Sequence, residues 1–264
     1  PLAWSPDGTR LLVEQDTRHG SRLSLLQAGS GELEDRVFPE NAQPVDYWIS
    51  DSSPWPADGS CVAYRVYVYE EEPESGRAES RIVRLSRSED VTVALEGTFV
   101  AWSPDGTQVL HATPVAPDTP ADDQSSVGPA RDFFVADRDG SRSRWIGQGY
   151  AAAWAPDGQR VAIIDSEEVL QVTNVETGLQ TTMLERGELR DAVGFAASAS
   201  PNFGVSPLLL TWSPDGEGIA LASSLIEDDN PKESAIVLVQ DDGYRILRRD
   251  VGGIFNMAWA SEGG

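Results

Sequence analysis

The stretch Trp154-Ala155-Pro156-Asp157-Gly158 is one of six related pentapeptides in this sequence of 264 residues. Successive tryptophans of the series are 47 to 58 residues apart, and the other five copies begin at Trp4, Trp55, Trp102, Trp212 and Trp259. A nearly fixed period of this length indicates an array of similar units rather than one continuous core. The sequence therefore predicts a repeat architecture.

Each residue of the pentapeptide has a local role. In the copy Ser103-Pro104-Asp105-Gly106, the proline presets φ, the aspartate can bond to its own backbone, and the glycine supplies a positive φ. The preceding Trp102 closes a short apolar strand and offers a large packing surface. Each copy therefore predicts an inner strand and a tight turn into the next strand. The second and sixth copies depart from the pattern, with Pro56-Ala57 and Ala260-Ser261-Glu262.

Each unit contains four predicted strands whose apolar content falls along the unit. Third strands such as residues 236–239 are continuous apolar runs, as in a sheet covered on both faces. Fourth strands such as residues 181–185 mix polar and apolar side chains, as an outer edge does. Four-stranded antiparallel units of this kind, repeated about an axis, predict an all-β fold, the β-propeller.

The predicted propeller is a single domain covering residues 1–264. It has five complete blades, a long loop insertion and the first strand of a sixth blade. The blades are residues 1–45, 46–96, 97–147, 148–185 and 207–250, the insertion is residues 186–206, and the partial blade is residues 253–264. This count predicts a fragment of a six-bladed or larger ring, with a five-bladed closure as the alternative.

The Trp-Ser-Pro-Asp-Gly turns, with downstream Asp-Gly turns such as Asp242-Gly243 between third and fourth strands, resemble the TolB-type propeller repeat, which is similar to the WD repeat. The resemblance extends over essentially the whole chain. It implies one of two roles, a scaffold protein or the gating propeller of a prolyl-oligopeptidase-like enzyme. It also implies an extracytoplasmic location, whether periplasmic, secreted or at the cell surface.

The composition disfavours some partners. The formal net charge is −23, and Lys232 is the sole lysine, so the chain lacks the clustered positive charge that nucleic acids require. No apolar run approaches the roughly 20 residues that span a bilayer, which argues against membrane insertion. The acidity fits either solubility, including adaptation to high salt, or a cationic partner or metal. Cys61 is the single cysteine, so an internal disulfide is excluded.

The lengths of the connections favour one face for function. Turns between first and second strands and between third and fourth strands are short, whereas the other connections include all the long ones, at residues 38–52, 70–80, 113–130, 185–207 and 223–233. Long loops on a rigid scaffold often carry binding residues.

These long connections contain aromatic and acidic residues that could bind a protein or a basic peptide. The alternative is that the acids are solvated loop tips and that the aromatics pack under the loops. The candidate partner-binding residues are Tyr47, Trp48, Glu71, Glu72, Asp122, Asp123, Phe195, Phe203, Asp228 and Asp229.

Catalytic and metal-binding patterns are weak in the sequence. It has no Gly-x-Ser-x-Gly motif, and His19 and His111 are its two histidines, which argues against a serine triad or a multi-histidine metal site. We interpret His111 as a packed strand residue and His19 as an exposed loop residue. The segment Asp137-Arg138-Asp139-Gly140 has too few ligands for a calcium loop and is predicted to be a turn. We expect no catalytic residue, metal or cofactor.

The sequence thus predicts a non-catalytic TolB-like propeller that binds a protein or peptide through the face with the long loops. The alternative is the substrate-gating propeller of a prolyl-oligopeptidase-like serine peptidase whose catalytic domain is absent from this chain. A third possibility is a metal-dependent, lactonase-type propeller.

Overall fold

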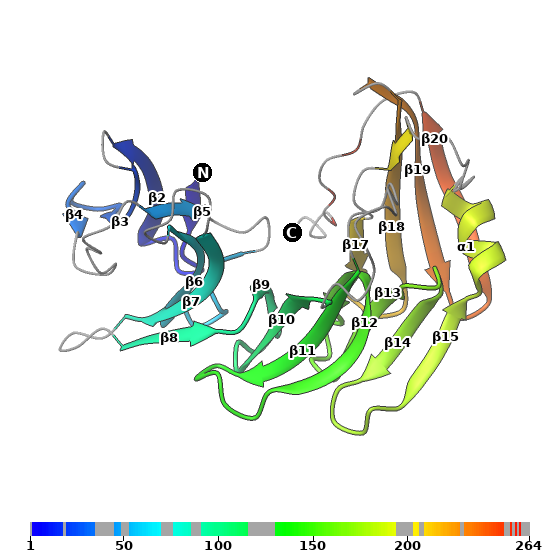
Figure 1. Cartoon of the computed structure of the whole chain (residues 1–264), viewed down its shortest axis with the longest axis horizontal. Coiled ribbons are helices and arrows are strands. Elements are labelled where there is room, and N and C mark those ends of the chain that lie inside the picture. The colour runs from blue at the N-terminus through cyan, green and yellow to red at the C-terminus, as the bar shows by residue number, and fades with distance from the viewer. Residues whose placement is uncertain are drawn as a thin grey trace. The chain divides into compact units, whose positions relative to one another are not determined.

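The computed structural model shows a chain built almost entirely of antiparallel strands (Figure 1). It describes residues 2–17, 20–34, 45–48, 53–69, 76–85, 91–115, 130–193, 203–205, 209–227, 230–250, 254, 257 and 259. The chain divides into two compact units, the first comprising Pro1–Thr113 with Phe134–Arg144 and the second Pro114–Phe133 with Trp145–Gly264. Each unit is described by itself below.

The first unit contains two four-stranded antiparallel sheets in which the strands pair in chain order. One sheet consists of β1 (Leu2–Trp4), β2 (Arg10–Thr17), β3 (Gly20–Gln27) and β4 (Leu33–Glu34). The other consists of β5 (Val45–Trp48), β6 (Cys61–Tyr69), β7 (Gly76–Arg84) and β8 (Val91–Leu95). The antiparallel pair β9 (Thr98–Trp102) and β10 (Gln108–Pro114) follows, and then β11 (Arg131–Asp137).

The second unit contains one set of four strands with this pattern and one five-stranded sheet. Four strands pair in chain order, namely β12 (Arg144–Trp154), β13 (Arg160–Asp165), β14 (Leu170–Asn174) and β15 (Gln180–Leu184). After the helix α1 (Arg186–Val193), both β16 (Phe203–Val205) and β17 (Leu209–Trp212) pair with β18 (Ile219–Glu227). The sheet then continues through β19 (Asn230–Gln240) to β20 (Gly243–Asp250).

Burial follows the predicted decline in apolar content along each unit. In β13, the four residues from Val161 to Ile164 are all buried, because both faces of this strand are covered. In β15, by contrast, residues 180–182 are exposed, as expected of an outer strand. The core of the second unit joins its two sheets through Ile164, Leu170, Val172, Leu184, Ile219, Leu221, Val237 and Val239.

The predicted turn is confirmed in all five copies that the structure describes. The glycine N–H donates to the carbonyl three residues earlier over 2.8–3.0 Å, and the glycine φ lies between 62° and 74°. The aspartate Oδ1 accepts the N–H two residues later over 2.8–3.0 Å. Hydrogen bonds from Ser5 and Thr9 lower the pKa of Asp7 to about 2. The turn aspartates are therefore charged and bonded within the turn.

The motif tryptophans join neighbouring repeats. The indole N–H of Trp55 donates to the Ala3 carbonyl over 3.2 Å, and that of Trp102 donates to the Pro54 carbonyl over 3.0 Å. In each case the acceptor residue immediately precedes the tryptophan of the previous copy. The same link joins Trp212 to Ala153 over 3.1 Å in the second unit. Trp154 differs, since its buried indole nitrogen has no hydrogen-bond partner among the described residues.

Two predicted loop assignments are wrong. Tyr47 and Trp48 lie in β5, where they pair with Val66 and Arg65 of β6, and Phe203 lies in β16, paired with Glu227. Both segments contain β-branched or aromatic residues that favour strands. The loops predicted at residues 70–80 and 223–233 are also shorter than expected, because β7 begins at Gly76 and the β18–β19 ladder extends to the pair Glu227 and Asn230.

The predicted insertion at residues 186–206 contains the helix α1, which the sequence analysis did not predict. Its first turn is capped by Glu188, whose carboxylate accepts the N–H of Glu185 over 3.0 Å. Leu189 and Ala192 are buried, and α1 lies beside β20 (Figure 1). Near its end, the Arg249 guanidinium of β20 donates to the carbonyls of Asp191 and Ala192.

Candidate functional site

The described part of the second unit contains an open groove of about 470 Å³. We call it the acidic groove. Its walls are β15, the turn between β17 and β18 and the turn between β19 and β20, and its lining residues are Arg160, Val172, Thr181, Met183, Trp212, Gly216, Glu217, Ile219, Val239, Gln240, Asp241 and Asp242. Small-molecule sites commonly have volumes of this order.

The floor of the acidic groove is apolar and buried. Trp212 closes β17, Ile219 opens β18 and Val239 ends the apolar run of β19, and all three side chains are buried. Their positions follow from the repeat, since the tight turn places the motif tryptophan beside the start of the next strand. Met183, partly buried on β15, also lines the groove. The floor therefore offers packing surface that the sheets hold in place.

Arg160 forms one end of the groove and is already neutralised. Its guanidinium lies over the Trp212 ring at 4.8 Å from the centroid, a favourable cation–π geometry. It also donates to the Gly216 carbonyl over 3.3 Å and to Asp157 over 2.6 Å. Partial burial tends to raise the pKa of Asp157, but hydrogen bonds from the Gln159 N–H and from Arg160 outweigh it and lower the pKa.

The rim carries three further carboxylates without a countercharge. Glu217 follows the motif glycine, and Asp241 and Asp242 form the two-residue turn between the paired residues Gln240 and Gly243. All three acidic residues are exposed. None of their carboxylates makes an ion pair with another residue of the described ranges. The acidic groove therefore has a surplus of negative charge above an apolar floor.

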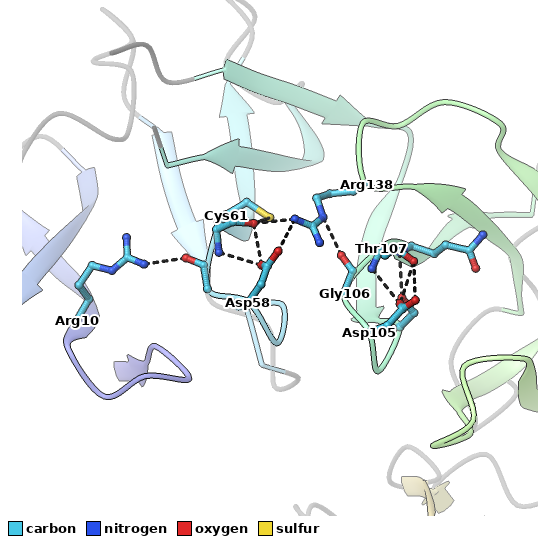
Figure 2. A network of polar contacts seen from close by, with 11 residues as sticks. Arg10, Asp58, Cys61, Asp105, Gly106, Thr107 and Arg138 are labelled. Carbon is cyan, nitrogen blue, oxygen red and sulfur yellow. Dashed lines mark hydrogen bonds and ion pairs between the residues drawn. The ribbon is translucent and has the colours of Figure 1, made fainter. Parts of the chain in front are cut away.

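The first unit shows what the same turns do when a basic residue is available. Figure 2 shows Arg138, from the turn after β11, between two motif turns. Its guanidinium donates to the Gly106 carbonyl over 2.7 Å, to Asp58 over 2.9 Å and to the Ser60 hydroxyl over 2.7 Å. In the same figure Arg10 donates to the Gly59 carbonyl over 2.7 Å. Arginine thus joins motif turns repeatedly.

Sequence position explains why the second unit differs. Arg138 is the second residue of the turn Asp137-Arg138-Asp139-Gly140, and the corresponding residue of Gln240-Asp241-Asp242-Gly243 is Asp241. The bond to the glycine carbonyl is made there by Arg160 instead. No residue of the turn between β19 and β20 is therefore needed to bond the Gly216 carbonyl. This turn contains Asp241 and Asp242, whereas the corresponding turn after β11 contains Arg138. Aligning the turns of the repeats could have found this site from the sequence.

Most of the predicted binding residues lie outside the part of the chain that the structure describes. Glu71, Glu72, Asp122, Asp123, Phe195, Asp228 and Asp229, together with His19, lie outside the described residues. Tyr47, Trp48 and Phe203 lie in the strands given above, and their role in binding stays a prediction. The acidic groove lies at the short turns, whereas the prediction favoured the long connections.

The reactive groups that the structure describes are buried. His111 contacts the Glu96 carbonyl at 2.8 Å and the Ser143 hydroxyl at 3.1 Å and stacks on Phe134, as predicted for a packed strand residue. Burial lowers its pKa, so the imidazole is neutral. Burial raises the pKa of the Cys61 thiol to about 11, which disfavours the reactive thiolate. Among the described residues, no group of three acidic, histidine or cysteine side chains could hold a metal ion.

No protein-family model and no curated protein matches the sequence. Solved structures match over most of the chain. An oligogalacturonate lyase from Vibrio parahaemolyticus is 14% identical, with a TM-score of 0.52, over 94% of this chain and 64% of the lyase. A prolyl endopeptidase structure is 13% identical, with a TM-score of 0.54, over 94% of this chain and 34% of that protein.

The chain has a β-propeller fold. The repeated antiparallel sheets and the likeness to these two structures both support this fold. TolB from Acinetobacter baumannii also matches over 94% of this chain and 55% of TolB, with 13% identity and a TM-score of 0.43. The chain thus spans less than two thirds of each of these proteins. The likenesses concern the fold alone, and the lyase and the prolyl endopeptidase show that enzymes also have this fold. No helix in the described ranges has the length and apolar character needed to cross a membrane.

Proposed function

We propose that this chain is a non-catalytic, TolB-like propeller that binds a peptide or protein partner through the acidic groove. The observation that carries the proposal is the combination of a fixed apolar floor with three carboxylates that have no described countercharge. An apolar cleft with a few polar groups at its edge is the usual form of a recognition site. The net charge of −23 favours a basic partner by long-range attraction.

The buried state of the reactive groups supports the non-catalytic part of the proposal. A buried neutral imidazole that is engaged at both nitrogens is poorly placed to shuttle protons to a substrate. The resemblance of the repeats to the TolB type further supports an extracytoplasmic setting. Binding through the long connections, at residues that lie outside the described ranges, is a compatible second surface.

Selection from a random peptide library displayed on phage tests this function. We expect peptides that bind the chain with a Kd near 10 μM or tighter, about −7 kcal/mol, and whose binding weakens when Met183, on the groove wall, is changed to Lys. Tyr244→Lys, on exposed β20 outside the groove lining, is the control. If no peptide binds, or if the selected peptides bind Met183→Lys unchanged, the groove is not the binding site.

The likeness to a prolyl endopeptidase structure over 34% of its length supports a second candidate, the gating propeller of a serine peptidase. In that case the full-length protein would contain a Gly-x-Ser-x-Gly motif outside these residues. Hydrolysis of a proline-containing peptide by the full-length protein, abolished by a serine-reactive fluorophosphonate, would favour this candidate over the first.

A further inference from the structure

A comparison of the two units indicates which chemical group of the partner the acidic groove binds. In the first unit, the Arg138 guanidinium sits between two motif turns and bonds a carboxylate, a hydroxyl and a carbonyl at once. In the second unit, the residue that corresponds to Arg138 is Asp241. The position that is basic in the turn Asp137-Arg138-Asp139-Gly140 is therefore acidic in the turn Gln240-Asp241-Asp242-Gly243, where it lines an open groove.

We propose that the acidic groove binds an arginine side chain of the partner, with its guanidinium at Asp241, Asp242 and Glu217 and its aliphatic stem against Met183. This inference rests on the proposed function and specifies the chemistry of the same site. The three carboxylates and the apolar wall line one continuous groove, so a side chain that is apolar along its stem and charged at its end matches both parts.

The arrangement of the carboxylates favours an extended organic cation over a metal ion. The described residues offer no group of three acidic, histidine or cysteine side chains placed to hold a metal. A guanidinium has five N–H donors in a planar fork and can bond separated carboxylates at once, whereas an ammonium is a compact and strongly hydrated charge. Guanidinium groups also pack on flat apolar surfaces, as Arg160 does on Trp212. These properties favour arginine over lysine.

The test compares three pentapeptides that differ at one residue, namely acetyl-Gly-Ala-X-Ala-Gly-amide with X as arginine, lysine or citrulline. Citrulline retains the shape of arginine without its charge. Binding is followed by ¹H–¹⁵N NMR titration of the wild-type chain. We expect the arginine peptide to shift the amide signals of residues 240–243, with an affinity at least tenfold above that of citrulline and at least threefold above that of lysine.

Two matched variants separate the groove from the general acidity of the chain. Asp241→Asn with Asp242→Asn removes two groove carboxylates, and asparagine is well tolerated in turns. Glu167→Gln with Glu32→Gln removes two exposed carboxylates from turns outside the groove lining. We expect the groove variant to weaken the arginine peptide about tenfold and the control variant by less than twofold. Equal melting temperatures of the two variants would verify that both are folded.

The inference is overturned if citrulline or lysine binds as well as arginine, or if the two double variants weaken binding equally. It is also overturned, with the proposed function intact, if selected library peptides bind at the groove wall but lack arginine. If neither the arginine peptide nor any library peptide binds, the proposed function fails together with the inference.

Discussion

At the scale of single residues, the repeat depends on a few positions whose backbone geometry is demanding. Gly8 and Gly106 occupy the same place in their turns, with φ of 67° and 69°. Their surroundings differ, since a Cβ added at Gly8 would meet nothing within 4 Å, whereas at Gly106 it would lie 2.7 Å from the Pro56 side chain. Substitutions at these two glycines therefore distinguish the cost of backbone strain, which both share, from the cost of steric overlap, which only Gly106 has.

Replacing either glycine with alanine should lower the free energy of unfolding, by different amounts. Gly8→Ala should cost about 1–2 kcal/mol because alanine disfavours the left-handed region. Gly106→Ala should cost about 1–3 kcal/mol more, because its Cβ also overlaps Pro56. Urea unfolding followed by tryptophan fluorescence measures both. An equal loss in the two variants would show that the contact with Pro56 is unimportant.

His111 predicts a specific pH dependence. Its folded pKa lies below the ordinary value because of burial, so the unfolded chain takes up a proton near pH 6.5 that the folded chain resists. Its contribution to stability is complete above that pH and falls as the pH drops, by up to about 1.4 kcal/mol per pH unit. Urea unfolding at pH 7.5 and 5.5 should give a smaller difference for His111→Gln than for the wild type. An unchanged difference would contradict this.

At the scale of elements, the predictability of a segment depends on how local its determinants are. The motif turns were predictable because proline, aspartate and glycine act within a few residues. The strand β5 and the helix α1 were missed because each is short, with four and eight residues. The bond between Arg138 and Asp58 joins residues 80 positions apart, and no local pattern indicates it. The acidic groove was missed because its walls come from separate strands, and only an alignment of the turns shows that Asp241 stands where Arg138 does.

Helix α1 gives a prediction at this scale, because Arg249 bonds two of its last carbonyls. Arg249→Ala should weaken the helix by about 1 kcal/mol through the loss of these bonds and of a favourable charge at the helix C-terminus. Hydrogen exchange of the amides of residues 189–193 should accelerate about fivefold. Arg245→Ala, an exposed change on the same strand, is the control and should leave the exchange unaltered. Equal exchange in both variants would show that Arg249 does not hold the helix.

At the scale of the whole molecule, the dominant property is the net charge of −23. Like charges at this density repel one another and destabilise the compact state. Added salt screens the repulsion within a distance of about 10 Å at 0.1 M.

Raising sodium chloride from about 20 mM to about 500 mM, across the range in which the screening length shortens most, should therefore stabilise the chain. We expect at least about 1 kcal/mol, or about 2–4 °C in melting temperature for a chain of this size. Calorimetry at both salt concentrations measures the shift, and equimolar sucrose controls for non-ionic effects. An unchanged melting temperature would mean that the charges are already balanced locally.

The links from the indoles of Trp55, Trp102 and Trp212 to the repeat before each have a consequence for how such a chain can arise. The acceptors are main-chain oxygens of Ala3, Pro54 and Ala153, which any amino acid supplies. A duplicated gene segment would therefore encode a repeat whose tryptophan can bond the preceding repeat without further mutation. The neighbouring side chains could then change while this hydrogen bond is kept.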